Sequence, residues 1–186
     1  MGFPQKVARK SVDIRTKVAR KSVIKSPSHK IQIIVRRCYN LSIPELPFSG
    51  NAIHNHFKLY MADTGLFISM LDEGTQFDIL NGDLFGFKGA IFENALADIF
   101  GKMGRPLYYY QKTDSLEIDF LIRYKGKSTP VECKARNGNA KSLKTLLNHP
   151  EKYHIESGIK VGDYNIGREN NVLTLPHYMA FMLTSI

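Results

Sequence analysis

Hydrophobic residues recur at helical spacing over residues 88–103, and this is the strongest helix pattern in the chain. Gly104 and Pro106 follow it and favour a helix end at that point. Glu93 lies at the border of the apolar stripe, whereas Asn94 falls on its polar side. The pattern predicts an amphipathic helix packed against a sheet, with Glu93 overhanging the sheet edge and Asn94 facing solvent.

Strand patterns follow this helix. Three runs of apolar and β-branched residues predict strands over residues 107–111, 116–124 and 129–135. The KGKS segment predicts the turn between the last two strands. Later elements are a helix over 140–148, strands over 158–161 and 172–175, and a helix over 176–183 that begins at a proline. The order helix, three strands, helix, strand predicts an α/β fold, a mixed sheet flanked by helices, with its core at about residues 88–175.

The segment before the long helix is expected to contain two strands and a loop. Residues 31–37 are rich in β-branched side chains and predict a strand, and the prolines and glycine between residues 44 and 50 predict a turn-rich loop. Residues 57–62 alternate as a short strand. Asp63 then has the character of an N-cap for a short helix that runs through Leu71.

Positive charge is concentrated at the amino end of the chain. The 186 residues carry a formal net charge of +9, and residues 1–37 hold 11 of the 26 Lys and Arg residues but only one acid, Asp13. The rest of the chain is close to neutral. Length, composition and charge together predict a basic, flexible arm over residues 1–30 and one globular domain over residues 31–186.

The arm contains an internal repeat, because KVARKSV occurs at residues 6–12 and again at residues 17–23. The offset of 11 residues equals three helical turns, so a basic amphipathic helix is one interpretation and a partly duplicated, flexible tail is the other. Lysine and arginine clusters bind nucleic-acid phosphates without needing a particular fold. The candidate phosphate-binding residues are Lys6, Arg9, Lys10, Lys17, Arg20 and Lys21.

Several other motifs do not hold up. The GKST segment at residues 126–129 lacks the earlier glycine of a phosphate-binding loop, because Leu121 occupies that position, and we predict no nucleotide site. Residues 54–56 spell HNH, but we expect a pair of histidines in a loop or at a strand edge. Cys38 and Cys133 form neither a disulfide framework nor a zinc spacing.

No apolar run has the roughly 18 residues that a membrane span requires, and the first residues lack the apolar segment of a secretory signal. We therefore expect a cytoplasmic protein without a membrane partner.

Polar side chains on two neighbouring strands carry the candidate chemistry. Alternation places Ile118, Phe120 and Ile122 on one face of the second strand, which leaves Asp119 on the other face with Glu117, Leu121 and Arg123. On the third strand, Glu132 and Lys134 project away from the face formed by Val131, Cys133 and Ala135. A short turn joins these strands, so Asp119 is expected near Glu132 and Lys134.

Closely spaced carboxylates favour a bound cation. Two of them about 5 Å apart repel each other by roughly 3 kcal/mol at an effective dielectric constant near 20. Mg²⁺ is the natural candidate because it binds a few carboxylate oxygens and retains water ligands. We expect Asp119 and Glu132 to hold Mg²⁺ with a backbone carbonyl such as that of Cys133, and Glu93 to join them from the helix.

The order of a helical Glu93, then Asp119, then Glu132-Cys133-Lys134 resembles the PD-(D/E)XK restriction-endonuclease-like superfamily, which has an αβββαβ core. More narrowly, the chain from about residue 31 resembles the uncharacterised domain that follows the ATPase core in prokaryotic AAA-type ATPases. The phrases that carry this likeness are KLYMADTGLF, KGAIFENALADIFGK, LEIDFLIRYKG, VECKA and LTLPHYMAFML. No Walker motif is present, so we expect an isolated or truncated piece whose partner is an ATPase core absent from this chain.

The resemblance implies Mg²⁺-dependent hydrolysis of phosphodiester bonds in DNA. Asp119 and Glu132 would hold the metal, Glu93 would bind it directly or through water, and Lys134 would orient the attacking water or stabilise developing charge. The alternative is a catalytically inactive module that binds DNA or a protein and is attached to an ATPase. The sequence leaves these two interpretations open.

Overall fold

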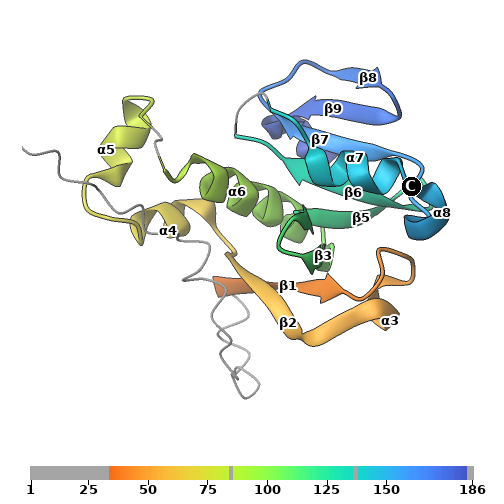
Figure 1. The fold of residues 1–186 in the computed structure, drawn as a ribbon. Coiled ribbons are helices and arrows are strands. Elements are labelled where there is room, and N and C mark those ends of the chain that lie inside the picture. Colours follow the sequence, from red (N-terminus) through yellow and green to blue (C-terminus); the bar gives the residue numbers. More distant parts are fainter. Residues whose placement is uncertain (1–33, 84–85, 136–137, 184–186) are drawn as a thin grey trace, which may run out of the picture.

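Two β-sheets with helices packed around them form the body of the protein (Figure 1). The computed structural model describes residues 34–83, 86–135 and 138–183. Within them, the first sheet has the order β2-β1-β3-β4, made of β1 (Val35–Leu41), β2 (Ala52–Met61), β3 (Leu107–Thr113) and β4 (Leu116–Ile118). The second has the order β5-β6-β7-β9-β8, made of β5 (Phe120–Tyr124), β6 (Lys127–Cys133), β7 (Gly158–Gly162), β8 (Gly167–Glu169) and β9 (Val172–Pro176).

The longest described helix is α6 (Lys88–Lys102), which runs from the side of α4 and α5 toward the sheets (Figure 1). The other helices are α3 (Phe48–Asn51), α4 (Thr64–Ser69), α5 (Thr75–Leu80), α7 (Lys141–Leu147), α8 (Pro150–Tyr153) and the 3₁₀ helix η1 (His177–Met182). None of the helices in the described ranges combines the length and the apolar character needed to cross a bilayer.

Both sheets are mixed. β1 is antiparallel to β2 and parallel to β3, and β3 is antiparallel to β4. In the second sheet, β5 and β6 form an antiparallel hairpin, β6, β7 and β9 are parallel, and β8 is antiparallel to β9. From α6 onward, the chain follows the predicted order of a helix, strands, a helix and a strand, except that the second predicted strand is divided into β4 and β5 and the short helix α8 follows α7. The predicted mixed α/β fold is confirmed.

The predicted strand over residues 116–124 is interrupted at Asp119, where the chain passes from the first sheet to the second. Ile118 pairs with Tyr110 in the first sheet, and Phe120 pairs with Val131 in the second. Asp119 belongs to neither ladder, so the alternation restarts out of phase after it. The prediction that Ile118 shares a face with Phe120 is therefore wrong for this residue.

Two hydrophobic clusters fill the interior, one on each side of β5. Phe120 packs with α6 residues such as Phe100 in the first cluster, whereas Leu121 packs with Leu143 of α7 and with Ile118 in the second. A strand with apolar side chains on both faces is covered from both sides, which explains the short apolar run of β5. Leu121, predicted to lie on the face of Asp119 and away from the apolar side chains, is buried beneath α7.

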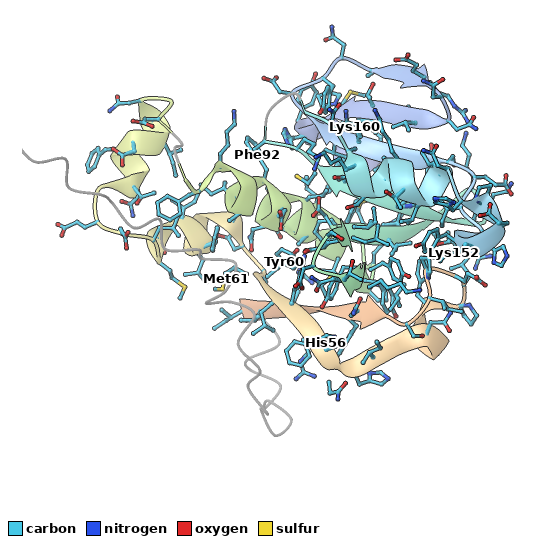
Figure 2. All side chains as sticks on the ribbon, viewed as in Figure 1. His56, Tyr60, Met61, Phe92, Lys152 and Lys160 are labelled. Atoms are coloured by element: carbon cyan, nitrogen blue, oxygen red, sulfur yellow. The ribbon has the colours of Figure 1, made fainter. Side chains whose placement is uncertain are left out.

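The prediction that Asn94 faces solvent is wrong. Its side chain is 2% exposed and does not face solvent. The Asn94 Oδ1 atom accepts a hydrogen bond from the Met61 backbone nitrogen at 2.8 Å, and Nδ2 donates to the Met61 carbonyl at 3.2 Å. Figure 2 shows Met61 at the end of β2, beside α6. The helical wheel missed this contact because the strand that covers this side of α6 lies more than 30 residues earlier in the sequence.

In the segment before α6, the strands begin and end at other residues than predicted. β1 extends to Leu41, a helical turn, α3, lies in the predicted loop, and β2 begins well before residue 57. The HNH residues 54–56 lie on β2, at an edge of the first sheet within the described residues, as predicted. Asp63 caps α4 as predicted, accepting a hydrogen bond from the Leu66 backbone nitrogen at 2.7 Å.

Later elements also hold, with small shifts at their ends. The GKST residues 126–129 form part of the β5–β6 hairpin, and the predicted terminal helix is the 3₁₀ helix η1. The basic arm over residues 1–30, including its six candidate phosphate-binding residues, lies outside the described residues.

Candidate active site

A polar pocket of about 230 Å³ opens where α6, the break at Asp119 and the end of β6 meet. All the predicted site residues of the globular domain line it. The lining residues are Glu93, Asp114, Ser115, Glu117, Asp119, Glu132, Cys133, Lys134 and Ser142. Segments about 40 residues apart in the sequence thus converge on one cavity.

Asp119 is held at the junction of the two sheets by a hydrogen bond to β6. Its Oδ2 atom accepts from the Cys133 backbone nitrogen at 2.8 Å. Burial raises the pKa of Asp119 to about 7, and the charge of Glu93 adds to this shift, while Lys58 and the Cys133 N–H oppose it. Near neutral pH, Asp119 therefore changes its charge readily when a cation approaches.

Glu132 projects from β6 into the same pocket and is only 5% exposed. Its Oε1 atom forms an ion pair with Lys134 Nζ at 2.5 Å. Its buried Oε2 atom has no hydrogen-bond partner among the described residues. A buried carboxylate oxygen without a partner is unfavourable, so this atom is suited to accept a cation or a donor from a ligand.

Lys134 and Cys133 occupy opposite sides of the end of β6, as the alternation predicted. Burial lowers the pKa of Lys134, but the hydrogen bond and charge of Glu132 outweigh burial and the net shift is upward. Burial raises the pKa of the Cys133 thiol, which lies in the first hydrophobic cluster. Cys133 contributes its backbone to the site, through the N–H that binds Asp119.

Glu93 reaches the pocket from α6. Its charge acts on Asp119 and on Lys58. The neighbouring Asn94 anchors α6 to the end of β2, and this fixes the helix face that presents Glu93. The predicted position of Glu93 at the edge of the apolar stripe is thus the one from which it reaches the other acids.

Two residues of β2 that the sequence analysis did not select, Lys58 and Tyr60, interact electrostatically with the acids of the pocket. Lys58 on β2 forms an ion pair with Glu117 and lies 4.8 Å from the centre of the Tyr109 ring. Burial lowers the pKa of Lys58, but Glu117, Asp119 and Glu93 reverse this effect and raise it overall. Tyr60, also on β2, has a buried hydroxyl without a hydrogen-bond partner among the described residues.

The sequence contains only a weak signal for the ion pair of Glu117 and Lys58. Glu117 shares the predicted face of Asp119, whereas Lys58 interrupts the apolar pattern of a strand whose position in the sheet could not be predicted. The Ser142 hydroxyl, at the start of α7, accepts a hydrogen bond from the Glu117 backbone nitrogen at 3.3 Å and closes that side of the pocket.

The donor chemistry of the pocket fits a hard divalent cation, because its acids present oxygen atoms and one oxygen of Glu132 is unpartnered. Over the described ranges, however, no three His, Cys, Asp or Glu side chains surround a common point closely enough to hold a metal. Lys134 occupies one oxygen of Glu132 instead. A cation bound by Glu132 through that oxygen would replace the Lys134 ammonium.

A family model matches the chain over about half of its length. Residues 88–178 match the family described as Domain of unknown function (DUF4143). The DUF4143 match begins with α6 and ends in η1, so it contains Glu93, Asp119, Glu132 and Lys134 but excludes Lys58. No curated protein and no solved structure matches the chain.

Proposed function

We propose that this protein hydrolyses phosphodiester bonds of DNA with a Mg²⁺ ion held by Asp119, Glu132 and Glu93, aided by the backbone carbonyl of Cys133. The observation that supports the proposal is the convergence of Glu93, Asp119, Glu132 and Lys134 on one polar pocket in which a buried oxygen of Glu132 has no partner. A buried carboxylate such as that of Glu132, with one oxygen unpartnered, is costly to maintain, which favours a functional role.

Bound Mg²⁺ would polarise the scissile phosphate and acidify a water molecule. The Cys133 N–H fixes the orientation of the Asp119 carboxylate, which would be one of the oxygen ligands of the cation. Glu132 would bind the cation in place of its ion pair with Lys134, which would leave the Lys134 ammonium available within the pocket. Lys134 would orient the attacking water or stabilise the negative charge that develops on the phosphate.

We also propose that the domain belongs to the restriction-endonuclease-like superfamily. The succession α6, β3, β4 with β5, β6, α7 and β7 corresponds to the αβββαβ order of the restriction-endonuclease-like superfamily. In the same proposal, the domain acts in the cytoplasm beside the ATPase core of an AAA-type ATPase, and the arm residues contact DNA.

A second candidate function is a non-catalytic module that binds DNA or a protein partner. The Lys134–Glu132 ion pair at 2.5 Å favours it, because this pair neutralises Glu132 without a metal. Such a module would bind its partner equally well with and without a chelator.

Cleavage of supercoiled and linear DNA by the full chain in Mg²⁺ distinguishes the two functions. Asp119→Asn and Lys134→Met each remove one charge from the pocket, and Glu156→Gln removes one from an exposed surface ion pair with Lys127. We expect cleavage by the unmodified chain and by Glu156→Gln, and a loss of about 100-fold or more in the other two. Equal cleavage by all four proteins, or no cleavage by the unmodified chain, would remove the nuclease proposal.

A further inference from the structure

Helices α4 and α5 stand apart from the two sheets, beside the amino end of α6 (Figure 1). Large apolar side chains on them face outward: Leu66, Met70, Phe77 and Leu80 are all exposed. The exposed fractions of Met70, Phe77 and Leu80 are 68%, 70% and 81%. Clustered exposure of this kind marks an interaction surface more often than a single exposed leucine does.

Acidic side chains occur in the same segment as these apolar residues. All five acids of this segment are exposed: Asp63, Asp72, Glu73, Asp78 and Asp83. Residues 59–87 contain no Lys, Arg or His. We call the exposed apolar and acidic side chains of residues 63–83 the acidic face. Its chemistry requires a partner that carries both positive charge and apolar side chains.

The chain itself contains a segment of this chemistry. Residues 1–33 hold nine Lys and Arg residues and one acid, and within them the two KVARKSV copies alternate basic residues with valines. This segment meets the described structure next to the acidic face, because the Ile34 carbonyl accepts a hydrogen bond from the Ala62 backbone nitrogen at 2.7 Å. Ala62 directly precedes Asp63, the cap of α4.

The length of chain between the repeat and this junction permits the contact. Ten residues separate Val23 from Ile34, and an extended chain spans about 3.3 Å per residue, or roughly 36 Å over this interval. Each of α4 and α5 has six residues and is therefore about 9 Å long. We propose that residues 6–23 of this chain bind its own acidic face, with lysines and arginines against the acids and valines against Met70, Phe77 and Leu80.

The proposal is independent of the pocket, since it uses none of the pocket residues. It also assigns the repeat a protein surface as its binding partner, where the sequence indicated phosphates. Nucleic acid and the acidic face would then compete for the same basic side chains.

Hydrogen exchange of the full chain, followed by mass spectrometry on peptides from residues 64–80, tests the contact. The arm variant Lys17→Glu/Arg20→Glu/Lys21→Glu reverses three charges of the second repeat. The face variant Asp72→Lys/Glu73→Lys/Asp78→Lys reverses three charges of the acidic face, and a third protein combines both sets. A matched control, Lys141→Glu/Lys144→Glu/Lys152→Glu, reverses three exposed charges on α7 and α8.

We expect exchange in residues 64–80 to rise about fivefold or more in the arm variant and to return close to the original rate in the combined protein. The control variant should leave these rates unchanged, and the rates should not depend on protein concentration. Unchanged exchange in the arm variant overturns the proposal, as does an equal increase in the control. Protection that grows with protein concentration would assign the contact to a second copy and would also overturn it.

Discussion

The Asp119 carboxylate accepts a hydrogen bond from the backbone N–H of Cys133, across a distance of 2.8 Å. The bond joins the point where the chain changes sheets to the end of β6, which carries Glu132 and Lys134. The bond holds Asp119, which belongs to neither strand ladder, beside the pocket that Glu132 and Lys134 also line.

The stability of the metal-free protein should depend on the protonation of Asp119. Its pKa in the folded state is about 7, above the ordinary value of 3.8. Between pH 4 and 7 the folded state therefore holds a proton that the unfolded state has released, so the Asp119 contribution to stability falls as pH rises and is lowest above pH 7. The full effect is on the order of 4 kcal/mol.

Urea unfolding at pH 5 and pH 8 without divalent cations measures this effect. Asp119→Asn cannot ionise, so the variant should gain stability relative to the unmodified chain as pH rises. Parallel pH profiles of the two proteins would contradict the assignment.

Divalent cations should stabilise the protein at pH 8. A ligand present at 100 times its dissociation constant adds about 2.7 kcal/mol to folding, which for a chain of this size raises Tm by roughly 5–10 °C. We expect this rise with Mn²⁺ in the unmodified chain and in Glu156→Gln, and its absence in Asp119→Asn. Differential scanning calorimetry with and without EDTA provides the measurement, and an equal rise in all three proteins would place the cation elsewhere.

Lys134→Met should separate cation binding from catalysis. Lys134 occupies one oxygen of Glu132, so its removal frees that oxygen for a metal. We expect Mn²⁺ affinity, measured by isothermal titration calorimetry, to increase by about threefold or more while DNA cleavage is lost. Weaker Mn²⁺ binding in Lys134→Met would show that the lysine supports the cation site and does not compete for it.

Lys58→Met should destabilise the protein by about 1–3 kcal/mol, because it leaves Glu117 without its cation at a partly buried position. Replacing both members of the pair, in Lys58→Met/Glu117→Gln, should recover most of this loss. Unfolding free energies of the two single variants and the double variant give the coupling energy. If the losses in unfolding free energy of the two single variants add up to that of the double variant, the Lys58–Glu117 interaction contributes no coupling energy.

Asn94→Leu should cost about 2–3 kcal/mol, since it leaves the backbone N–H and carbonyl of Met61 without their side-chain partner. Asn55→Ala, on the exposed part of β2, is the matched control and should change stability by less than about 0.5 kcal/mol. Urea denaturation of both variants checks the difference, and similar losses would argue against a special role for Asn94.

Much of the site could be predicted from local sequence patterns. The helical stripe indicates that Glu93 lies at the edge of α6, and a hairpin with a short turn brings Glu132 next to the strand that contains Asp119. These predictions succeed because each depends on the periodicity of one element or on the pairing of two neighbours in sequence.

The remaining features depend on contacts between segments far apart in the chain. Lys58 meets Glu117 only because β1 lies between β2 and β3, an arrangement that no local pattern specifies. Asn94 is buried because the end of β2 and α4 cover that side of α6. The change of face at Ile118 follows from the transfer of the chain between two sheets, and alternation alone predicts an uninterrupted strand.

Because Asp119 lies between two sheets, the pocket is built from residues of both sheets. Glu117 and Lys58 lie on strands of the first sheet, whereas Glu132 lies on β6 of the second sheet and Lys134 directly follows β6. A rotation of one sheet against the other would alter the spacing of the acids without breaking either ladder. A partner that binds the edge strand β2 would therefore influence the spacing of the acids from a distance.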